Sequence, residues 1–403
     1  MRLTREEQAM LDGESGEGVR KAMEIIIALG RIYQADDLVP ISSVQVSGVS
    51  YKNLGDAGLD FLEEWAGQGA RARVPATLNP AGMDLSGWQE LGFSPEFARC
   101  QERVISAYAA LGVSPTCTCT PYLIGYVPEF GQHVAWAESS AVSYANSVLG
   151  ARTNREGGPS ALAAAVTGRT ARYGLHQDAH RLATVVVEVD TDIHSEADAG
   201  ALGYLVGQQV RNQVPYLKME KWEANESDLK TLGAAMAASG AVALYHIAGV
   251  TPEAKAQQMI ADGASTLVVD SLKPAYQALD GSAGTVDLVS LGCPHASLAE
   301  LEAIASYLDG RRIVTSLWIT TARATREAAE RENLVARLEE TGARVVADTC
   351  MVVAPVDGLG FRTMATNSAK MAFYTPAHSR LSVRFGTLEQ CLDAALSGRW
   401  RVS

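Results

Sequence analysis

Cysteine is scarce in this sequence, and its few cysteines do not form a framework. Six cysteines in 403 residues are too few for a disulfide scaffold. No C-x-x-C pair occurs, so the spacing differs from that of a ferredoxin and from the close pairs that usually bind zinc. We therefore expect reduced thiols in a cytoplasmic protein, unless some of them bind a metal.

An excess of positive charge is also lacking. The formal net charge is −12 at pH 7, which argues against a nucleic-acid partner because phosphate backbones bind to basic surfaces. A local group of Arg and Lys side chains is still sufficient to hold a small anionic substrate. The charge therefore excludes one class of partner and leaves small-molecule enzymes open.

Long hydrophobic runs are missing as well. The longest apolar stretches, such as residues 234–250, are rich in Ala and Gly and are too short to cross a bilayer. The first residues are charged and have helical character, without the apolar core of a signal peptide. The sequence thus predicts neither a membrane span nor a secretory leader.

The composition is that of a globular protein, with 47% apolar and 20% charged residues, and the length suits one large or two medium domains. From about residue 200, short helices alternate with strands, which is the pattern of a parallel sheet in an α/β fold. We place a soft boundary there, between residues 1–200 and 201–403. The strands predicted after it are 241–248, 265–269, 287–291, 313–318, 344–347 and 381–385, with helices at 298–307 and 323–340.

The first half has a similar plan, with polar loops after its strands. The predicted helices are 4–30, capped by Thr4 with Glu7 and ended by Gly30, then 56–66, 94–112 and 159–168, and the strands are 38–41, 44–49, 71–77 and 182–189. Loops 47–52 and 78–82 follow two of these strands. Gly48 permits close backbone approach, so the amides and hydroxyls of its loop suit a carboxylate or phosphate.

Reactive side chains are concentrated between residues 115 and 159. The stretch holds two cysteines, an acid–hydroxyl pair at the start of a helix predicted at 137–148, and two arginines: Cys117, Cys119, Glu138, Ser139, Arg152 and Arg155. This mixture suits a site for a metal and a small anionic substrate. Glu138 could equally be a helix N-terminal charge, and the arginines are interpreted slightly more as structural ion-pair partners of Glu138 and Glu156 than as phosphate ligands.

Three cysteines that are distant in the sequence share a local setting. Cys119 precedes a Thr-Pro turn, Cys293 follows a predicted strand and precedes a proline, and Cys350 ends a predicted strand. Positions of this kind converge at the carboxyl ends of strands in an α/β fold. Three thiolates can hold a cubane iron–sulfur cluster and leave one iron open as a Lewis acid. On an extended chain, Cys117 would lie on the same face as Cys119. We prefer Cys119 as the metal ligand because the proline-stiffened turn follows Cys119 directly.

Other interpretations of these cysteines remain open from the residues alone. A buried cysteine is usually only a small apolar residue, which is our interpretation of Cys100 and Cys391. Zinc is a rival metal, and Cys293 with His295 could form a nucleophile and its base. We interpret His295 rather as a turn or metal-supporting histidine.

Several long blocks of the sequence resemble the large, catalytic subunit of the aconitase X family, an iron–sulfur dehydratase group. The similarity extends over nearly the whole chain. The blocks that carry it are VSGVSYKNLGDAG (46–58), TLNPAGMD (77–84), TCTPY (118–122), WAESSAVSYANSVLGARTNREGGPSA (136–161), GCPH (292–295) and DTC (348–350).

The resemblance implies an aconitase-like α/β fold, with parallel or mixed sheets flanked by helices around a central Fe–S crevice. It implies a [4Fe-4S] cluster held by Cys119, Cys293 and Cys350, with one open iron. It also implies a partner, a small subunit with a swivelling β/α domain that carries the serine base. We expect that domain on a separate chain, because the blocks of the large subunit already account for these 403 residues.

Two substrates are known in the family that the sequence resembles. One type dehydrates (R)-5-phosphomevalonate to trans-anhydromevalonate 5-phosphate for isoprenoid synthesis, and the unfused length favours it. The other, often fused, dehydrates cis-3-hydroxy-L-proline. A non-catalytic, partner-binding subunit is the alternative from another class.

The resemblance also assigns substrate contacts, with two of them, Glu138 and Ser139, as catalytic groups. On the residues alone, Lys370 would be a solvated surface lysine and Asn79-Pro80 an ordinary turn. The contacts implied are Gly48, Val49, Ser50, Asn79, Pro80, Glu138, Ser139 and Lys370.

Overall fold

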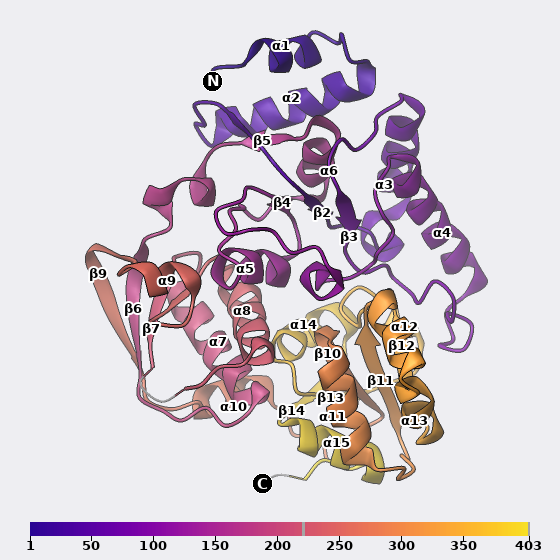
Figure 1. Ribbon diagram of the computed structural model, residues 1–403. Helices are drawn as coiled ribbons and strands as arrows, with labels where there is room; N and C mark the ends of the chain where they lie inside the picture. The colour runs from indigo at the N-terminus through magenta and orange to yellow at the C-terminus, as the bar shows by residue number, and fades with distance from the viewer. Residues whose placement is uncertain (220–221, 402–403) are drawn as a thin grey trace.

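The structure is a computed structural model that describes residues 1–219 and 222–401. Within these residues it is an α/β fold with three parallel sheets flanked by helices and one antiparallel pair of strands. Figure 1 shows the N-terminal part at the top, the middle part at the left and the C-terminal part at the lower right. The predicted α/β class, with parallel sheets flanked by helices, is therefore confirmed, whereas the Fe–S crevice remains a prediction.

The N-terminal part is built on a small parallel sheet of order β3-β2-β4, with β1 and β5 paired beside it. Thr4 and Glu7 form the predicted capping box at the start of the first helix. The helices enclose a core of their own, in which Met23, Val44 and Leu162 are buried. The elements are α1 Arg5–Leu11, α2 Glu17–Ile32, β1 Leu38–Pro40, β2 Val44–Val46, α3 Tyr51–Gly67, β3 Ala76–Leu78, α4 Pro95–Ala110, η1 Pro121–Ile124, β4 Ala135–Trp136, α5 Ser139–Ser147, α6 Gly158–Thr167 and β5 Arg169–Ala171.

The middle part is a four-stranded parallel sheet of order β8-β7-β6-β9, and helices α7 and α8 pack against each other beside it (Figure 1). Helix α8 also packs on α5 and so connects this part to the first. The elements are η2 Gly174–His176, η3 Asp178–His180, β6 Ala183–Val189, α7 Glu196–Val210, β7 Pro215–Lys218, α8 Glu226–Gly240, β8 His246–Ile247, α9 Pro252–Ala256, β9 Ile260–Val269 and α10 Lys273–Leu279.

The C-terminal part is a five-stranded parallel sheet of order β12-β11-β10-β13-β14. One buried cluster joins it to the other two parts, since Met83, Val187 and Met364 belong to the same apolar core. The elements are β10 Leu288–Ala296, α11 Leu298–Leu308, β11 Ser316–Thr321, α12 Arg323–Arg331, α13 Leu334–Glu340, β12 Arg344–Ala347, η4 Val356–Gly358, β13 Thr363–Thr366, α14 Ala369–Ser379, β14 Ser382–Phe385 and α15 Leu388–Ser397.

Two predicted helices have different ends, and local packing explains both. The helix predicted at 4–30 is two helices, α1 and α2, and Gly30 does not stop α2, which continues to Ile32. A Cβ at Gly30 would lie 2.7 Å from the sulfur of Met1, so the glycine permits close packing rather than a turn. The helix predicted at 323–340 is two helices, because Asn333 takes a left-handed backbone with φ of 59° between them.

Two predicted strands are shorter, because their backbone groups bond elsewhere. Of residues 71–77 only the end is strand, since the amide of Arg73 donates to the carbonyl of Ala165 instead of a neighbouring strand. Of residues 241–248 only His246–Ile247 is strand, since the amide of Val242 donates back to Met236 at the end of α8. Helix α14, which carries Lys370, has no counterpart among the predicted elements.

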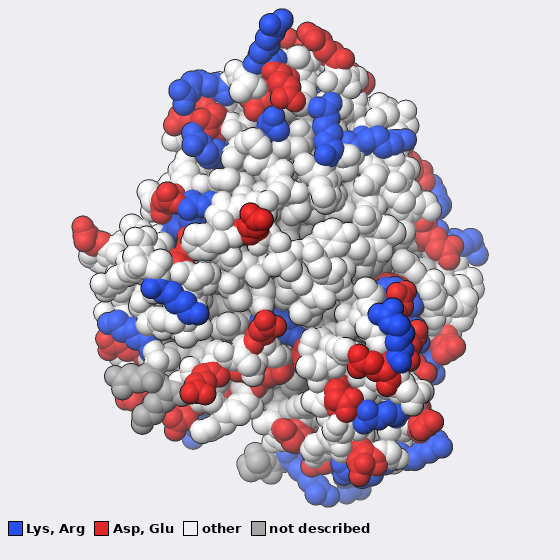
Figure 2. Space-filling model, viewed as in Figure 1, with Lys and Arg blue, Asp and Glu red and all other residues white. Residues whose placement is uncertain are grey.

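Charged side chains of both signs are interspersed around the rim of the face drawn in Figure 2, and the middle of that face is largely uncharged. Among the described residues, no helix is both long and apolar enough to traverse a membrane.

Candidate active site

Cys119, Cys293 and Cys350 line one pocket of about 240 Å³, although Cys119 lies in a loop and Cys293 lies within β10 rather than at a strand end. The pocket lies where the N-terminal and C-terminal parts meet, and the amide of Ala81 donates there to the carbonyl of Asp348. Eight of the eleven residues named from the sequence are among its lining. The full lining is Asn79, Pro80, Cys119, Glu138, Ser139, Arg155, Cys293, Cys350, Val352, Val353, Lys370, Tyr374 and His378.

The backbone at each cysteine is held in a way that the local sequence explains. Gly292, just before Cys293, has a φ of 85°, and a Cβ there would lie 2.1 Å from the carbonyl oxygen of Thr320. Only glycine fits that approach, so it fixes where β10 delivers the thiol. Cys350 follows β12, and its carbonyl accepts from the amides of Val353 and Ala354 in a tight turn.

Cys119 and Cys293 are buried and Cys350 is half-buried, and the three thiols are close enough to influence one another's pKa values. Burial raises the pKa of Cys119, and the neighbouring charges of Glu138, Cys350 and Cys293 raise it further, against the effect of Lys370. Burial also raises the pKa of Cys293, and that of Cys350 to about 12. Three thiolates so close together therefore need a cation, and metal binding is the usual way to deprotonate such a group.

The chemistry of the three thiols is that of iron–sulfur ligands. In the ranges that the structure describes, no three His, Cys, Asp or Glu side chains are grouped as the ligands of one metal ion would be. Three cysteines in the lining of one pocket match the number of protein thiolates that can hold a cubane with one open iron. The residues present thus fit an iron–sulfur cluster.

Of the remaining cysteines, Cys117 does not line the pocket, although it lies two residues from Cys119. It is fully buried in the apolar core of the N-terminal part. Cys391 is likewise buried, in the core of the C-terminal part, while Cys100 is only partly buried. These placements agree with the preference for Cys119.

His295 connects all three cysteine-bearing segments. It follows Cys293 by two residues, its Nδ1 lies 3.0 Å from the hydroxyl of Thr118, and its Nε2 lies 2.9 Å from the carbonyl oxygen of Thr349. Because a carbonyl only accepts, Nε2 carries the proton and Nδ1 accepts from Thr118. The His295 amide also donates to the sulfur of Cys119 at 3.2 Å. Burial lowers the pKa of His295 to about 4, so the ring is neutral at pH 7 as this arrangement requires.

Substituting His295 with glutamine is expected to weaken retention of bound iron by about 10- to 100-fold, the effect of changing a residue that orients metal ligands. The measurement is the rate at which a reconstituted protein loses its visible absorbance to a chelator. His246→Gln is the matched control, since His246 is fully buried and its Nε2 also bonds a carbonyl, that of Arg181. Equal rates for the two variants would contradict a positioning role for His295.

Glu138 and Lys370 form a buried ion pair in the wall of the pocket. Glu138 is the N-cap of α5 and accepts from the amide of Ala141 at 2.8 Å, and Ser139 and Ser140 donate their hydroxyls to the same carboxylate. Burial raises the pKa of Glu138, but the Lys370 charge and these hydrogen bonds outweigh it, so the pKa is lowered. Burial lowers the pKa of Lys370, but the negative charges of Glu138 and the cysteines have a larger effect, so its pKa is raised. Both groups are therefore ionised, and Lys370 is not the solvated lysine that its sequence alone suggests.

Asn79 is connected to the strand before the Gly48 loop, since its amide donates to the carbonyl of Val46 at 2.9 Å. Asn79 lines the pocket, and its buried Oδ1 has no hydrogen-bond partner within the described part of the chain, which leaves it free for a ligand. Gly48, Val49 and Ser50 are not among the lining residues. The Ser50 hydroxyl donates to the carbonyl of Val353, and Val353 does line the pocket. A substrate contact through this loop remains a prediction.

One residue that sequence reasoning missed, Gln101, holds these two loops in place. Gln101 is fully buried in α4, where its side chain accepts from the amides of Tyr51 and Gly82 and donates to the carbonyl of Val49. It thereby joins the two predicted substrate loops. An isolated glutamine in an amphipathic helix gives no signal of this role.

Arg323, which sequence reasoning also missed, connects the segment after Asn79 to the segment before Cys350. It pairs with Asp84, which follows the loop of Asn79, and with Asp348, two residues before Cys350.

Two further missed residues, Tyr374 and His378, line the pocket from successive turns of α14. Their i, i+4 spacing places both on one helix face.

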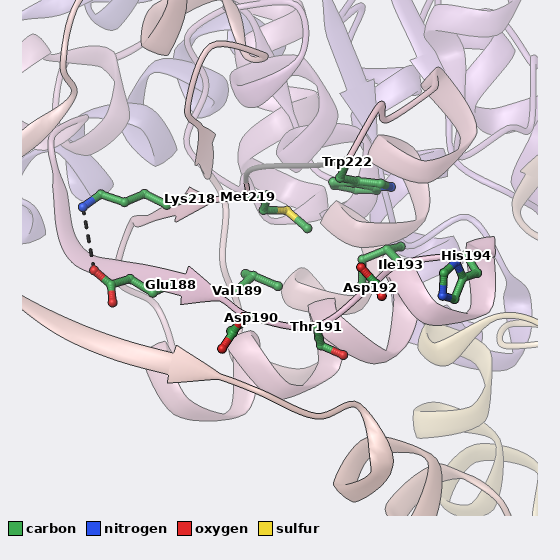
Figure 3. Close-up of a pocket in the computed structure, with 10 residues that line it drawn as sticks. All are labelled: Glu188, Val189, Asp190, Thr191, Asp192, Ile193, His194, Lys218, Met219 and Trp222. Carbon is green, nitrogen blue, oxygen red and sulfur yellow. Dashed lines mark ion pairs between the residues drawn. The ribbon is translucent and has the colours of Figure 1, made fainter.

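A larger hollow, of about 840 Å³, lies beyond the ends of β6 and β7 (Figure 3). Its polar side chains include Glu188, Asp190 and Asp192, which are exposed, and Lys218 lies 3.9 Å from Glu188. Among the residues that the structure describes in its lining there is no cysteine and no buried ionisable group. Although it is larger, we therefore take the smaller pocket, which contains the three cysteines, as the candidate active site.

Models of the aconitase X family match three stretches of the chain: the first domain at residues 1–179, the second at 183–274 and the third at 286–397. The chain is 48% identical to the "Phosphomevalonate dehydratase large subunit" of Methanocaldococcus jannaschii, over 97% of this chain and 99% of that protein. It is 38% identical to the "Cis-3-hydroxy-L-proline dehydratase" of Pseudomonas aeruginosa, over 99% of this chain and 70% of that protein. The crystal structure of Thermococcus kodakaraensis aconitase X in its holo-form superposes with a TM-score of 0.92 at 46% identity, over 98% of this chain and all of that one.

Proposed function

This chain belongs to the aconitase X family, and we propose that it is the large subunit of a cytoplasmic iron–sulfur hydro-lyase that dehydrates (R)-5-phosphomevalonate. The observation that supports the proposal most is the convergence of Cys119, Cys293 and Cys350 on the pocket that also contains the ion pair of Glu138 and Lys370. The substrate is inferred from the names of near-full-length relatives such as that of Methanocaldococcus jannaschii. The division of the chain near residue 200 remains part of the proposal.

The cofactor that we propose is a [4Fe-4S] cluster on the three thiols. When bound, it would supply one iron without a protein ligand, a Lewis acid that assists departure of the substrate hydroxyl. The thiols are suited to this role because their burial keeps them protonated until a metal displaces the protons. The relative from Thermococcus kodakaraensis is described as a holo-form, which supports a bound cofactor.

In the mechanism we propose, the residues of this chain bind and orient the substrate. Lys370 is ionised and hydrogen-bonded to Glu138, so it is a fixed cation for a substrate carboxylate or for charge that develops beside it. The unpartnered Oδ1 of Asn79 would accept from a substrate hydroxyl. Ser139 Oγ, 3.2 Å from the Glu138 carboxylate, is available for a second hydrogen bond.

Glu138 does not suit the role of a general base in this arrangement. Its lowered pKa and four hydrogen-bond donors favour the ionised form, which holds Lys370 and the start of α5 in place. The base that removes the proton beside the carboxylate is therefore proposed to lie on the small subunit, as a serine. That subunit is the partner that the names of the relatives suggest.

The test is turnover by the large subunit reconstituted with iron and sulfide under anaerobic conditions, together with its small subunit. (R)-5-Phosphomevalonate should be converted to trans-anhydromevalonate 5-phosphate, and cis-3-hydroxy-L-proline should react far more slowly. The reverse preference would favour the second candidate, to which the 38% identical relative from Pseudomonas aeruginosa points. An iron-loaded complex that is inert to both would favour a non-catalytic subunit.

A further inference from the structure

Arg155 differs from the other charged residues of the pocket. Lys370 is already paired with Glu138, and the three thiols are the predicted metal ligands. Arg155 lines the pocket and is exposed, and among the described residues its guanidinium has neither an ion-pair nor a hydrogen-bond partner. It is thus the one permanently charged, uncompensated cation of the lining.

The carboxylates that could have paired with Arg155 are occupied. Glu138 accepts from Lys370, and Glu156 accepts from the hydroxyls of Ser160 at 2.6 Å and Thr170 at 2.8 Å. The other arginine of the stretch, Arg152, pairs with Asp178. The structural ion pair predicted for Arg155 is therefore absent, whereas Arg152 does form one.

The backbone at Arg155 is fixed although its side chain is free. The side chain of Asn154 accepts from the amide of Leu175 at 2.9 Å and donates to the carbonyl of Tyr173 at 3.0 Å. On the other side, the amide of Glu156 donates to the carbonyl of Trp136 at 2.9 Å. Both neighbours are buried, so Arg155 borders the pocket from a backbone that is held on both sides. Such preorganisation lowers the entropic cost of binding an anion.

The segment of Arg155 lies against the loop predicted to hold an anion. A Cβ at Gly158 would lie 2.6 Å from the carbonyl oxygen of Ser47, so the two backbones are in direct contact. Gly48 follows with a φ of 79° and open space where a side chain would be. The segment that follows Arg155 is thus in backbone contact with the residue that precedes Gly48.

We infer that Arg155 binds the phosphate of the substrate and makes the pocket selective for a phosphorylated hydroxy acid over an unphosphorylated one. The inference rests on the proposed function. A guanidinium forms bidentate hydrogen bonds with phosphate, and phosphomevalonate carries a phosphate that cis-3-hydroxy-L-proline lacks. Because dehydration leaves the phosphate unchanged, this contact contributes equally to the ground state and the transition state.

The kinetic test compares Arg155→Gln and Arg155→Lys with the unsubstituted enzyme, as the iron-loaded complex with the small subunit. Loss of one charge-assisted contact should raise KM for phosphomevalonate by about 10- to 100-fold with little change in kcat, and lysine should restore part of the loss. Arg31→Gln is the matched control, since Arg31 is an exposed arginine of α2 outside the pocket lining. An unchanged KM, or a fall in kcat alone, would overturn the inference.

A binding measurement separates this inference from the proposed function. Calorimetric titration of the metal-free large subunit with phosphomevalonate and with mevalonate gives a ratio of affinities that depends on the phosphate. The ratio should exceed one for the unsubstituted chain and approach one for Arg155→Gln. Equal ratios overturn the role of Arg155 alone, and no binding of phosphomevalonate by the unsubstituted chain overturns both proposals. Loss of the small subunit from the variant on native gels, with affinity intact, would make Arg155 a subunit contact instead.

Discussion

Single substitution of Cys119, Cys293 or Cys350 with alanine is expected to abolish iron binding and turnover in the reconstituted complex. Each change leaves two thiols, and a cubane held by two cysteines loses an anchoring iron as well as the geometry of the site. The effect should exceed the roughly 10- to 100-fold weakening that follows from changing a residue that only orients a ligand. Iron content per chain and visible absorbance measure it directly.

The chain contains its own controls for this prediction. Cys117 and Cys391 are both fully buried, and neither belongs to the pocket lining. Alanine at either position removes a sulfur and leaves a small cavity, which costs stability but not a ligand. If Cys117→Ala lost its iron and Cys119→Ala retained it, the ligand assignment would be wrong although a metal site would remain.

Lys370→Met is expected to destabilise the protein by about 3–5 kcal/mol at pH 7, because it leaves the Glu138 carboxylate buried without its cation. The loss should shrink at low pH. The pKa of Glu138 is lower in the native protein than its ordinary value of 4.5, so its ionised form stabilises the native protein at pH values above 4.5. This stabilisation is lost as the pH falls through the lowered native pKa. Denaturant unfolding at pH 7 and near pH 4 measures both effects. Turnover should also fall, by about 10- to 100-fold for one charged hydrogen bond to substrate.

Two further variants distinguish stability from substrate binding. Combining Lys370→Met with Glu138→Gln removes both charges and should restore most of the stability without restoring turnover. Arg181→Met breaks another buried pair, with Glu253 at 2.8 Å, away from the pocket. It should destabilise the fold to a similar degree and leave KM unchanged. A normal KM in Lys370→Met would remove Lys370 from the substrate contacts.

The α/β fold was predictable because its elements are signalled locally. β12 occupies the residues predicted for it, and α11 differs from its predicted range by one residue. The misjudged elements depend on contacts that no local pattern encodes, such as the packing of Met1 on Gly30 or the bond from Arg73 to Ala165. Periodicity describes one segment at a time, and tertiary contacts then shorten or extend it.

The site was predictable where residue chemistry is unusual and unpredictable where it is ordinary. Cysteine before a proline turn is a rare pattern, and it marked Cys119 and Cys293. Gln101 and Arg323 are common residue types in helices, and their connecting roles arise only from partners far away in the sequence. Arg155 was visible as a candidate, but only the pairing of its neighbours distinguishes it from Arg152.

The lining of the pocket runs from Asn79 to His378, so the site draws on most of the chain. Contacts between residues so distant in sequence form late in folding, because the loops that they close are long and costly in entropy. The ligand cage should therefore appear only after the C-terminal sheet has docked on the N-terminal part. Iron supplied to a nascent or truncated chain would meet scattered thiols, and productive loading has to wait for the finished polypeptide.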